Sequence, residues 1–142
     1  MTNIFIDTDV IIDFLKDRKP FSDDSTKMFN LIGQNKINGC VSSLCFSNLY
    51  YLLSKSAPHK RVIFDLNDLS QRLEILNVDK NIVKSALASD FKDFEDAIQY
   101  FTAREHGKIN IIITRNIKDY KNSSLPVMTP ETFLKTFEQI VK

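Results

Sequence analysis

The chain of 142 residues is poor in the residue types that loops and several binding motifs require. It has three glycines, four prolines, two cysteines and no tryptophan. With so few glycines, neither of the glycine-rich phosphate loops, GxxxxGK or GxGxxG, can be assembled. Cys40 and Cys45 lie five apart with no second pair. This spacing excludes a zinc pattern and predicts free thiols.

Long apolar runs are missing as well. No stretch approaches the ~18 apolar residues that a membrane-spanning helix needs, and the N-terminus lacks the features of a signal peptide. We therefore expect a cytoplasmic protein with no membrane partner. The net charge is only +1, so any surface for nucleic acid has to be a local patch. The composition, 43% apolar and 26% charged, is typical of globular proteins, and we expect a single domain over residues 1–142.

Strand patterns and helix patterns alternate along the chain. Short apolar runs predict strands at residues 4–6, 40–42, 74–78, 111–114 and 127–128, with a turn at Asn38 and Gly39 before the second. Apolar residues at helical spacing predict helices at residues 10–15, 22–34, 43–54, 58–72, 79–88, 93–106 and from 129 onward. Strands separated by helices need crossover connections, so the pattern predicts an α/β fold with a mainly parallel sheet.

The first apolar run ends in a carboxylate. Asp7 directly follows residues 4–6, at the carboxyl end of a strand that we expect to be central, and ligands of α/β proteins gather at that edge. A carboxylate there is difficult to explain by structure alone, so Asp7 is the leading functional candidate. Asp9 is either a second ligand or, more simply, the N-cap of the first helix.

The helix predicted at residues 93–106 adds more acid. Asp93 and Asp96 are three apart and share one helix face, whereas Glu95 is predicted to point away together with Gln99. The pair also fits a capping box at the helix start. If this helix begins at the edge where Asp7 lies, three or four carboxylates surround one point. Oxygen ligands without clustered His or Cys select Mg²⁺ or Mn²⁺, which would remove the repulsion.

The loop after residues 111–114 is polar. If its strand neighbours the first strand, Asn116 and Asp119 approach Asp7, although Asp119 also fits a solvated loop position. The same loop contains three basic residues that would contact phosphates, namely Arg115, Lys118 and Lys121.

Residues 4–10, 93–99 and 112–120, taken together, resemble the PIN-domain family, which includes the VapC-like toxins of bacterial toxin–antitoxin pairs. The resemblance extends over nearly the whole chain. It implies a three-layer α/β/α fold with a five-stranded sheet in the order 3-2-1-4-5. It also implies a ribonuclease that needs Mg²⁺ or Mn²⁺, with RNA as substrate and with an antitoxin protein and a second copy of the chain as candidate partners.

Transferred position by position, the resemblance implies that Asp7 and Asp96 hold the metal and act in catalysis, with Asp93 as a compensating ligand. Thr114 matches the Thr or Ser that ends the fourth strand of the family. We place Thr114 and Thr8 in an auxiliary role beside these acids.

Two positions depart from the family pattern. The position of the family's last acid is occupied by Asn116 in this sequence. Asp119 is near enough to substitute for that acid, so Asn116 and Asp119 are both catalytic candidates. The glutamate that the family usually carries after the second strand falls on Asn48. An amide oxygen can ligate or hold a water molecule, so Asn48 is counted as auxiliary, but it brings no charge and cannot act as a base.

Three functions follow from these residues. The leading hypothesis is a metal-dependent endoribonuclease. The second, motivated by Asn48 and Asn116, is a PIN domain that has lost turnover and acts by binding RNA or protein. The third is a haloacid-dehalogenase-like phosphatase, because Asp7 and Asp9 fit its D-x-D strand end and Thr114 could imitate its phosphate-binding threonine. Against it, no lysine followed by a paired-acid motif is found after Thr114, and the chain is short for such a phosphatase.

Overall fold

The computed structural model of the protein describes residues 1–141, with side chains through residue 139. Within these residues, five parallel strands form one sheet in the order β3-β2-β1-β4-β5. The strands are β1 (Thr2–Ile6), β2 (Ile37–Ser42), β3 (Glu74–Leu76), β4 (Ile111–Ile113) and β5 (Val127–Met128). The helices are α1 (Thr8–Leu15), α2 (Ser22–Gly33), α3 (Ser43–Leu53), α4 (His59–Arg72), α5 (Lys80–Leu87), α6 (Phe94–His106), the short 3₁₀ helix η1 (Ile117–Tyr120) and α7 (Pro130–Val141). The predicted fold class and strand order are confirmed.

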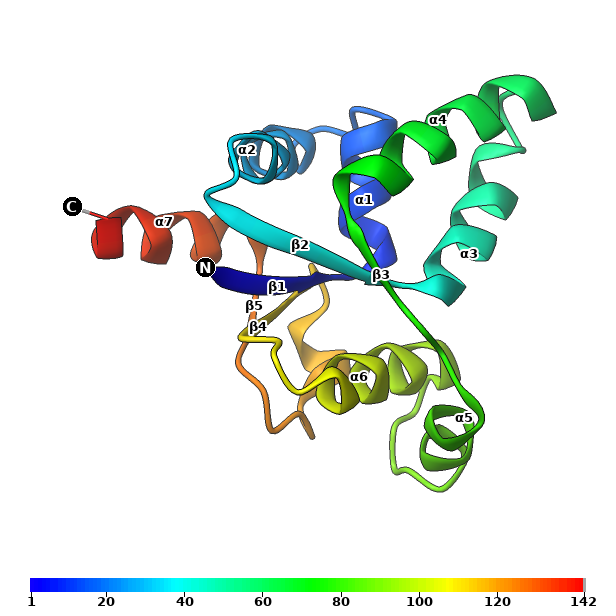
Figure 1. Ribbon diagram of the computed structural model, residues 1–142, viewed down its shortest axis with the longest axis vertical. Coiled ribbons are helices and arrows are strands. Elements are labelled where there is room, and N and C mark those ends of the chain that lie inside the picture. The colour runs from blue at the N-terminus through cyan, green and yellow to red at the C-terminus, as the bar shows by residue number, and fades with distance from the viewer. Residues whose placement is uncertain (142) are drawn as a thin grey trace.

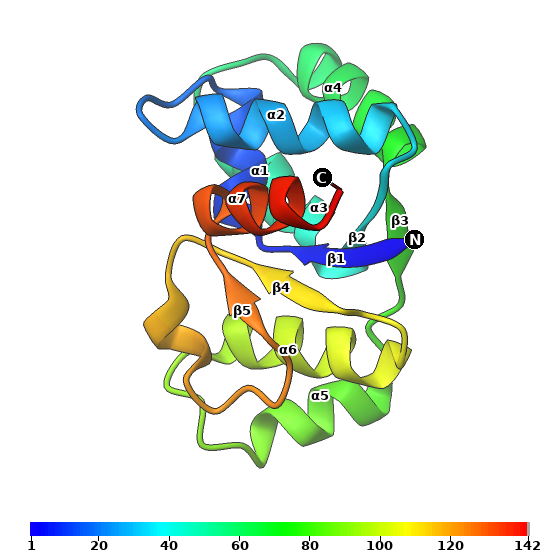
Figure 2. The same cartoon turned by 90° about the vertical axis from the view of Figure 1, so that its left-hand side faces the viewer.

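Helices cover both faces of the sheet. Helices α1 to α4 and α7 lie on one face, and α5 and α6 lie on the other (Figures 1 and 2). Successive residues of β1 serve both layers, since Ile4 and Ile6 pack into the core under α1 and α2, while Phe5 packs into the core under α6. All three side chains are fully buried. This explains why the first strand is a continuous apolar run and not an alternating one.

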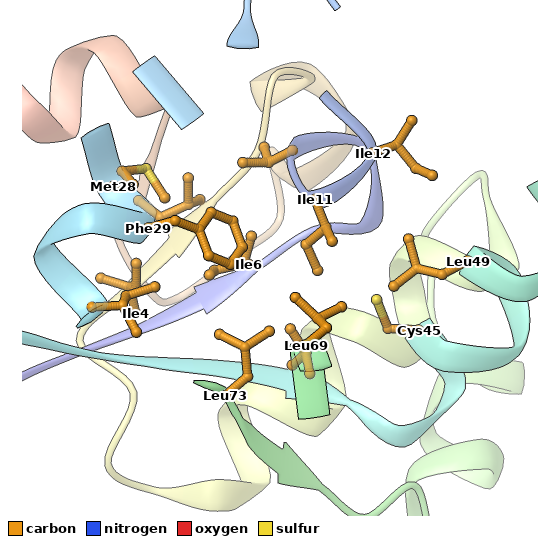
Figure 3. Packing of buried hydrophobic residues seen from close by; sticks show 14 of the residues in the cluster. Ile4, Ile6, Ile11, Ile12, Met28, Phe29, Cys45, Leu49, Leu69 and Leu73 are labelled. Atoms are coloured by element: carbon orange, nitrogen blue, oxygen red, sulfur yellow. The ribbon is translucent and has the colours of Figure 1, made fainter. Parts of the chain in front are cut away.

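The larger of the two cores fixes the first helix against the first strand. Figure 3 shows Ile6 of β1 close to Ile11 of α1 and Phe29 of α2. Leu69 of α4 and Leu73, which directly follows α4, complete the packing. Since both ends of the β1–α1 junction are anchored in this core, the polar residues at the junction have little freedom to move.

The second strand begins earlier than predicted. The expected turn at Asn38 and Gly39 is wrong, because both residues pair with β1 inside β2. Gly39 lies in tight packing there: a Cβ atom on it would meet Ile32 Cδ1 at 2.7 Å and Leu73 Cδ2 at 2.8 Å, so these two side chains would have to shift. Among the described helices, none is long and apolar enough to cross a membrane.

Candidate active site

Asp7 lies where β1 ends and α1 begins. Its backbone N–H still donates to Ile113 of β4 at 2.9 Å, while its carboxylate accepts from the Thr8 backbone N–H at 2.7 Å as the N-cap of α1. Two hydroxyls complete the contacts, with Thr114 Oγ1 at 2.9 Å and the Tyr120 hydroxyl at 3.2 Å from Asp7 Oδ2. Burial raises the pKa of Asp7 in spite of these donors. The side chain is therefore held in one orientation but is costly to ionise.

The N-terminus of α6 brings the second group of acids to the same place. Asp93 caps the helix as predicted, accepting from the backbone N–H of Asp96 at 3.0 Å. Burial, together with the negative charges of Asp7 and Asp93, raises the pKa of Asp96 to about 7. Asp7 and Asp96 line the same cleft, so the charge of Asp7 disfavours ionisation of Asp96.

Glu95 also lines this site, and Gln99 Nε2 donates to Thr8 Oγ1 at 3.5 Å, so the prediction that both side chains point away is wrong. Its Oε1 accepts from Asn48 Nδ2 at 2.8 Å, and burial and the charge of Asp7 raise its pKa. Gln99 is fully buried beneath it and accepts from the Ser42 hydroxyl. Glu95 and Asp96 are consecutive residues in the first turn of α6. At a helix end, consecutive side chains can both extend past the end, so helical spacing alone does not place them on different sides.

Asp9 does not cap α1, because Asp7 does. Instead, Asp9 Oδ2 accepts from Asn116 Nδ2 at 3.0 Å. The other oxygen, Oδ1, is buried and has no hydrogen-bond partner within the described part of the chain. Burial and the charge of Asp7 raise the pKa of Asp9 to about 7. A buried carboxylate oxygen without a donor is expensive unless a cation or a water molecule reaches it.

These acids surround a cleft of about 390 Å³ at the carboxyl edge of the sheet. Of the predicted site residues, six line it, namely Asp7, Thr8, Asp93, Asp96, Asn116 and Asp119. Sequence reasoning missed four charged residues of its wall, namely Lys16, Arg18, Lys55 and Glu95. Thr114 is fully buried behind Asp7, and Asn48 reaches the cleft only through Glu95. Tyr120 was also missed, although its place in the polar loop six residues after Thr114 was a usable signal.

The three predicted phosphate-binding residues separate in the structure. Lys118 and Lys121 line a neighbouring cavity. Arg115 lines neither of these two cavities. Its Nε lies 2.7 Å from the buried carboxylate of Asp13, and its guanidinium lies 4.1 Å from the ring centre of Phe21. Arg115 is thus held by an internal ion pair, a role that its position in a polar loop did not indicate.

The donor set of the cleft suits a hard divalent cation. Every ligand candidate offers oxygen, the acids raise one another's pKa values, and one buried oxygen of Asp9 lacks a donor. In the described residues, however, no three side chains of Asp, Glu, His or Cys are close enough together to form a metal site. The residues fit Mg²⁺ or Mn²⁺ by chemistry, and closing a coordination shell requires side-chain movement.

The comparison with known sequences identifies this arrangement. The family model for the PIN domain matches residues 3–118. The chain belongs to the PIN-domain family. It is 28% identical to ribonuclease VapC1 of Aquifex aeolicus over 142 aligned positions, which cover 96% of each chain.

Solved structures agree with the fold of this PIN domain. The DNA-bound VapBC complex of Salmonella typhimurium contains a chain with a TM-score of 0.69 and 20% identity, covering 92% of this chain and 99% of that one. VapBC2 of Rickettsia felis, bound to a promoter fragment, gives a TM-score of 0.66 at 18% identity, covering 90% and 98%. The resemblance stated from the sequence is confirmed, and the phosphatase interpretation loses its support.

Proposed function

We propose that this PIN-domain protein is a metal-dependent endoribonuclease that acts in the cytoplasm. The observation that carries the proposal is the convergence of acids from β1, α1 and α6 on one cleft, which raises the pKa values of Asp9 and Asp96 to about 7. Such a cluster is unfavourable in itself and becomes favourable when it binds a divalent cation. Phosphodiester hydrolysis is the chemistry that a cation held by carboxylates serves best.

In this proposal, Asp7, Asp96 and Asp93 hold Mg²⁺ or Mn²⁺, with Asn116 and Asp119 as auxiliary ligands. The cation, when bound, neutralises charge on the phosphate and favours deprotonation of water. The chain's own contribution is orientation: hydrogen bonds from Thr114 and Tyr120 hold the Asp7 carboxylate in place. Positioning of this kind is a large part of enzymatic phosphoryl chemistry.

Glu95 supports an active enzyme in place of a binding-only domain. Asn48 occupies the position where the family pattern has a glutamate, and its amide donates to Glu95 at 2.8 Å. A carboxylate is therefore available beside the position where one is missing. Burial and the charge of Asp7 raise the pKa of Glu95 above its usual value, which makes this carboxylate a stronger base towards water. Loss of turnover through Asn48 and Asn116 remains the second candidate function.

RNA cleavage by the purified full-length chain tests the proposal. We expect labelled single-stranded RNA to be cut with Mn²⁺ or Mg²⁺, not to be cut in EDTA, and not to be cut by Asp7→Asn. The matched control is Asp68→Asn, which alters an exposed carboxylate on α4 that pairs with Arg72 and should leave cleavage unchanged. Cleavage that persists in EDTA or in Asp7→Asn contradicts the proposal, and RNA binding without cleavage favours the second candidate.

We also propose that the protein is the toxin of a toxin–antitoxin pair and that it forms a homodimer. The likeness to chains of VapBC complexes supports the toxin assignment, and the homodimer is what the family resemblance implies. Expression in bacteria should arrest growth for the wild type and not for Asp7→Asn, and sedimentation of the purified chain should give twice the monomer mass. Normal growth at equal protein levels contradicts the toxin assignment.

A further inference from the structure

A second cavity of about 370 Å³ adjoins the acidic cleft. The two share three wall residues, Asp93, Asp96 and Asp119, so a ligand can extend from one into the other. The rest of the second wall comes from the segment before α6 and from η1 with the residues that follow it. These residues are Asp90, Phe91, Lys92, Lys118, Lys121 and Asn122.

The lysines of this cavity are available to a ligand. Lys92, Lys118 and Lys121 are all exposed, and none of them forms an ion pair with another described residue, in contrast to Arg18 and Arg115, which both pair with Asp13. Beyond the shared acids, the wall carries three positive charges against the single negative charge of Asp90. This side of the cavity is therefore suited to an anion.

An aromatic ring forms the apolar part of the wall. Phe91 is partly exposed and stacks on Tyr100, with ring centres 5.2 Å apart. It also meets Tyr120 edge-on at 6.2 Å, and the hydroxyl of Tyr120 donates to Asp7. Phe101 lies near Phe91 as well, with ring centres 6.2 Å apart. Three rings thus back Phe91 and restrict its movement.

We propose that this cavity is a nucleotide subsite for single-stranded RNA, next to the phosphate that is cut. The base packs on Phe91, and the backbone phosphates contact Lys118, Lys121 and Lys92. An apolar ring with a lysine rim is the combination that unpaired nucleotides bind, since every base has a face for stacking and every phosphate a charge for lysine. The inference rests on the proposed function, because it assigns the substrate to that same cleft.

The test measures RNA binding in EDTA, so that cleavage does not interfere. The probe is a short fluorescein-labelled single-stranded RNA of mixed sequence, followed by fluorescence anisotropy at several salt concentrations. The test variant is Lys118→Ala with Lys121→Ala, and the matched control is Lys60→Ala with Lys84→Ala, two exposed lysines on α4 and α5. All four lysines are exposed, so both variants should fold, as thermal unfolding will verify.

We expect the test variant to bind at least about tenfold more weakly, with a salt slope lower by about 1.4, because each phosphate contact to a single strand contributes ~0.7. Phe91→Leu should weaken binding about 5- to 100-fold without changing the slope, since it removes stacking only. A duplex of the same sequence should compete poorly. Binding by the test variant equal to that of the control, or equal competition by the duplex, overturns the subsite.

Cleavage measured in parallel separates this inference from the proposed function. Cleavage by the wild type, with RNA binding unaffected by Lys118→Ala and Lys121→Ala, overturns the subsite and leaves the nuclease standing. Binding that depends on the two lysines, with no cleavage under any condition, supports the subsite and overturns the nuclease. If the wild type does not bind RNA, the subsite is overturned. The same conclusion holds if the cavity binds an acidic peptide and not RNA.

Discussion

Replacing Asp96 by asparagine should stabilise the protein in EDTA at alkaline pH. Burial and the charges of Asp7 and Asp93 raise the pKa of Asp96 from 3.8 to about 7. The folded chain therefore holds this proton more tightly than the unfolded chain, and ionisation of Asp96 costs stability. The cost is absent below about pH 4, grows between about pH 4 and 7, and is constant above that. Asparagine is neutral at every pH, so the substitution removes the cost.

The size of the effect follows from the shift. Each pKa unit corresponds to ~1.4 kcal/mol, so a shift from 3.8 to about 7 is equivalent to about 4 kcal/mol in a fully buried site. Asp96 is only partly buried, and water screens its interactions, so we expect about 2 kcal/mol. In a chain of this length that raises the unfolding midpoint Tm by about 4–8 °C at about pH 8.

Thermal unfolding followed by circular dichroism measures this prediction. Wild type, Asp96→Asn and the matched control Asp68→Asn are compared in EDTA at about pH 4.5 and about pH 8. The gain in Tm from Asp96→Asn should be at least about twofold larger at the higher pH, and the control should show no such gain. Mn²⁺ should then stabilise the wild type more than Asp96→Asn. If Asp96→Asn melts at or below the wild-type Tm at about pH 8, the acids do not repel one another as argued.

Three further substitutions test other parts of the structure. Asp13→Asn should lower the free energy of unfolding by about 3–5 kcal/mol in urea titrations, because it leaves two arginines without their fully buried partner. Glu95→Gln should lower kcat for RNA cleavage about 100-fold, and an unchanged kcat would exclude it as a proton acceptor. Tyr120→Phe should cost about 1 kcal/mol of stability and move the acidic limb of the pH–rate profile upward, since Asp7 loses a donor that lowers its pKa.

The sequence predicted most strongly the features that depend on burial. The run at residues 4–6 and the run that ends at Thr114 were identified as strands, and the first of them as central, because a strand covered on both faces must be apolar throughout. They pair directly, with Ile4 opposite Ile111, and this pairing brings Thr114 to Asp7. The strand order itself came from the family resemblance, since pairing between distant segments leaves no local signal.

Contacts between elements explain what the sequence did not predict. Asp7 and Asp9 both suit a helix cap, and the choice depends on where strand pairing stops, which is at the bond from Asp7 N–H to Ile113. The direction of Glu95 depends on α3, whose Asn48 donates to it. The internal role of Arg115 depends on the charge of Asp13, buried in α1 and 102 positions away in the chain.

The acids of the cleft give a reason for the lysines that lie near it. The net charge of the whole chain is only +1 and does not reveal this local group of positive charges. An RNA phosphate approaching Asp7, Asp9 and Asp96 meets charges of its own sign, in a cleft where burial, together with the charge of Asp7, already raises the pKa values of Asp9 and Asp96. A divalent cation offsets that repulsion only at the point where it binds. Phosphates on either side of that point need other positive charges, and the cleft and its neighbouring cavity supply lysines on both flanks, Lys16 and Lys55 on one and Lys118 and Lys121 on the other. The cation and the lysines would thus neutralise phosphate charges at different positions along one strand of RNA.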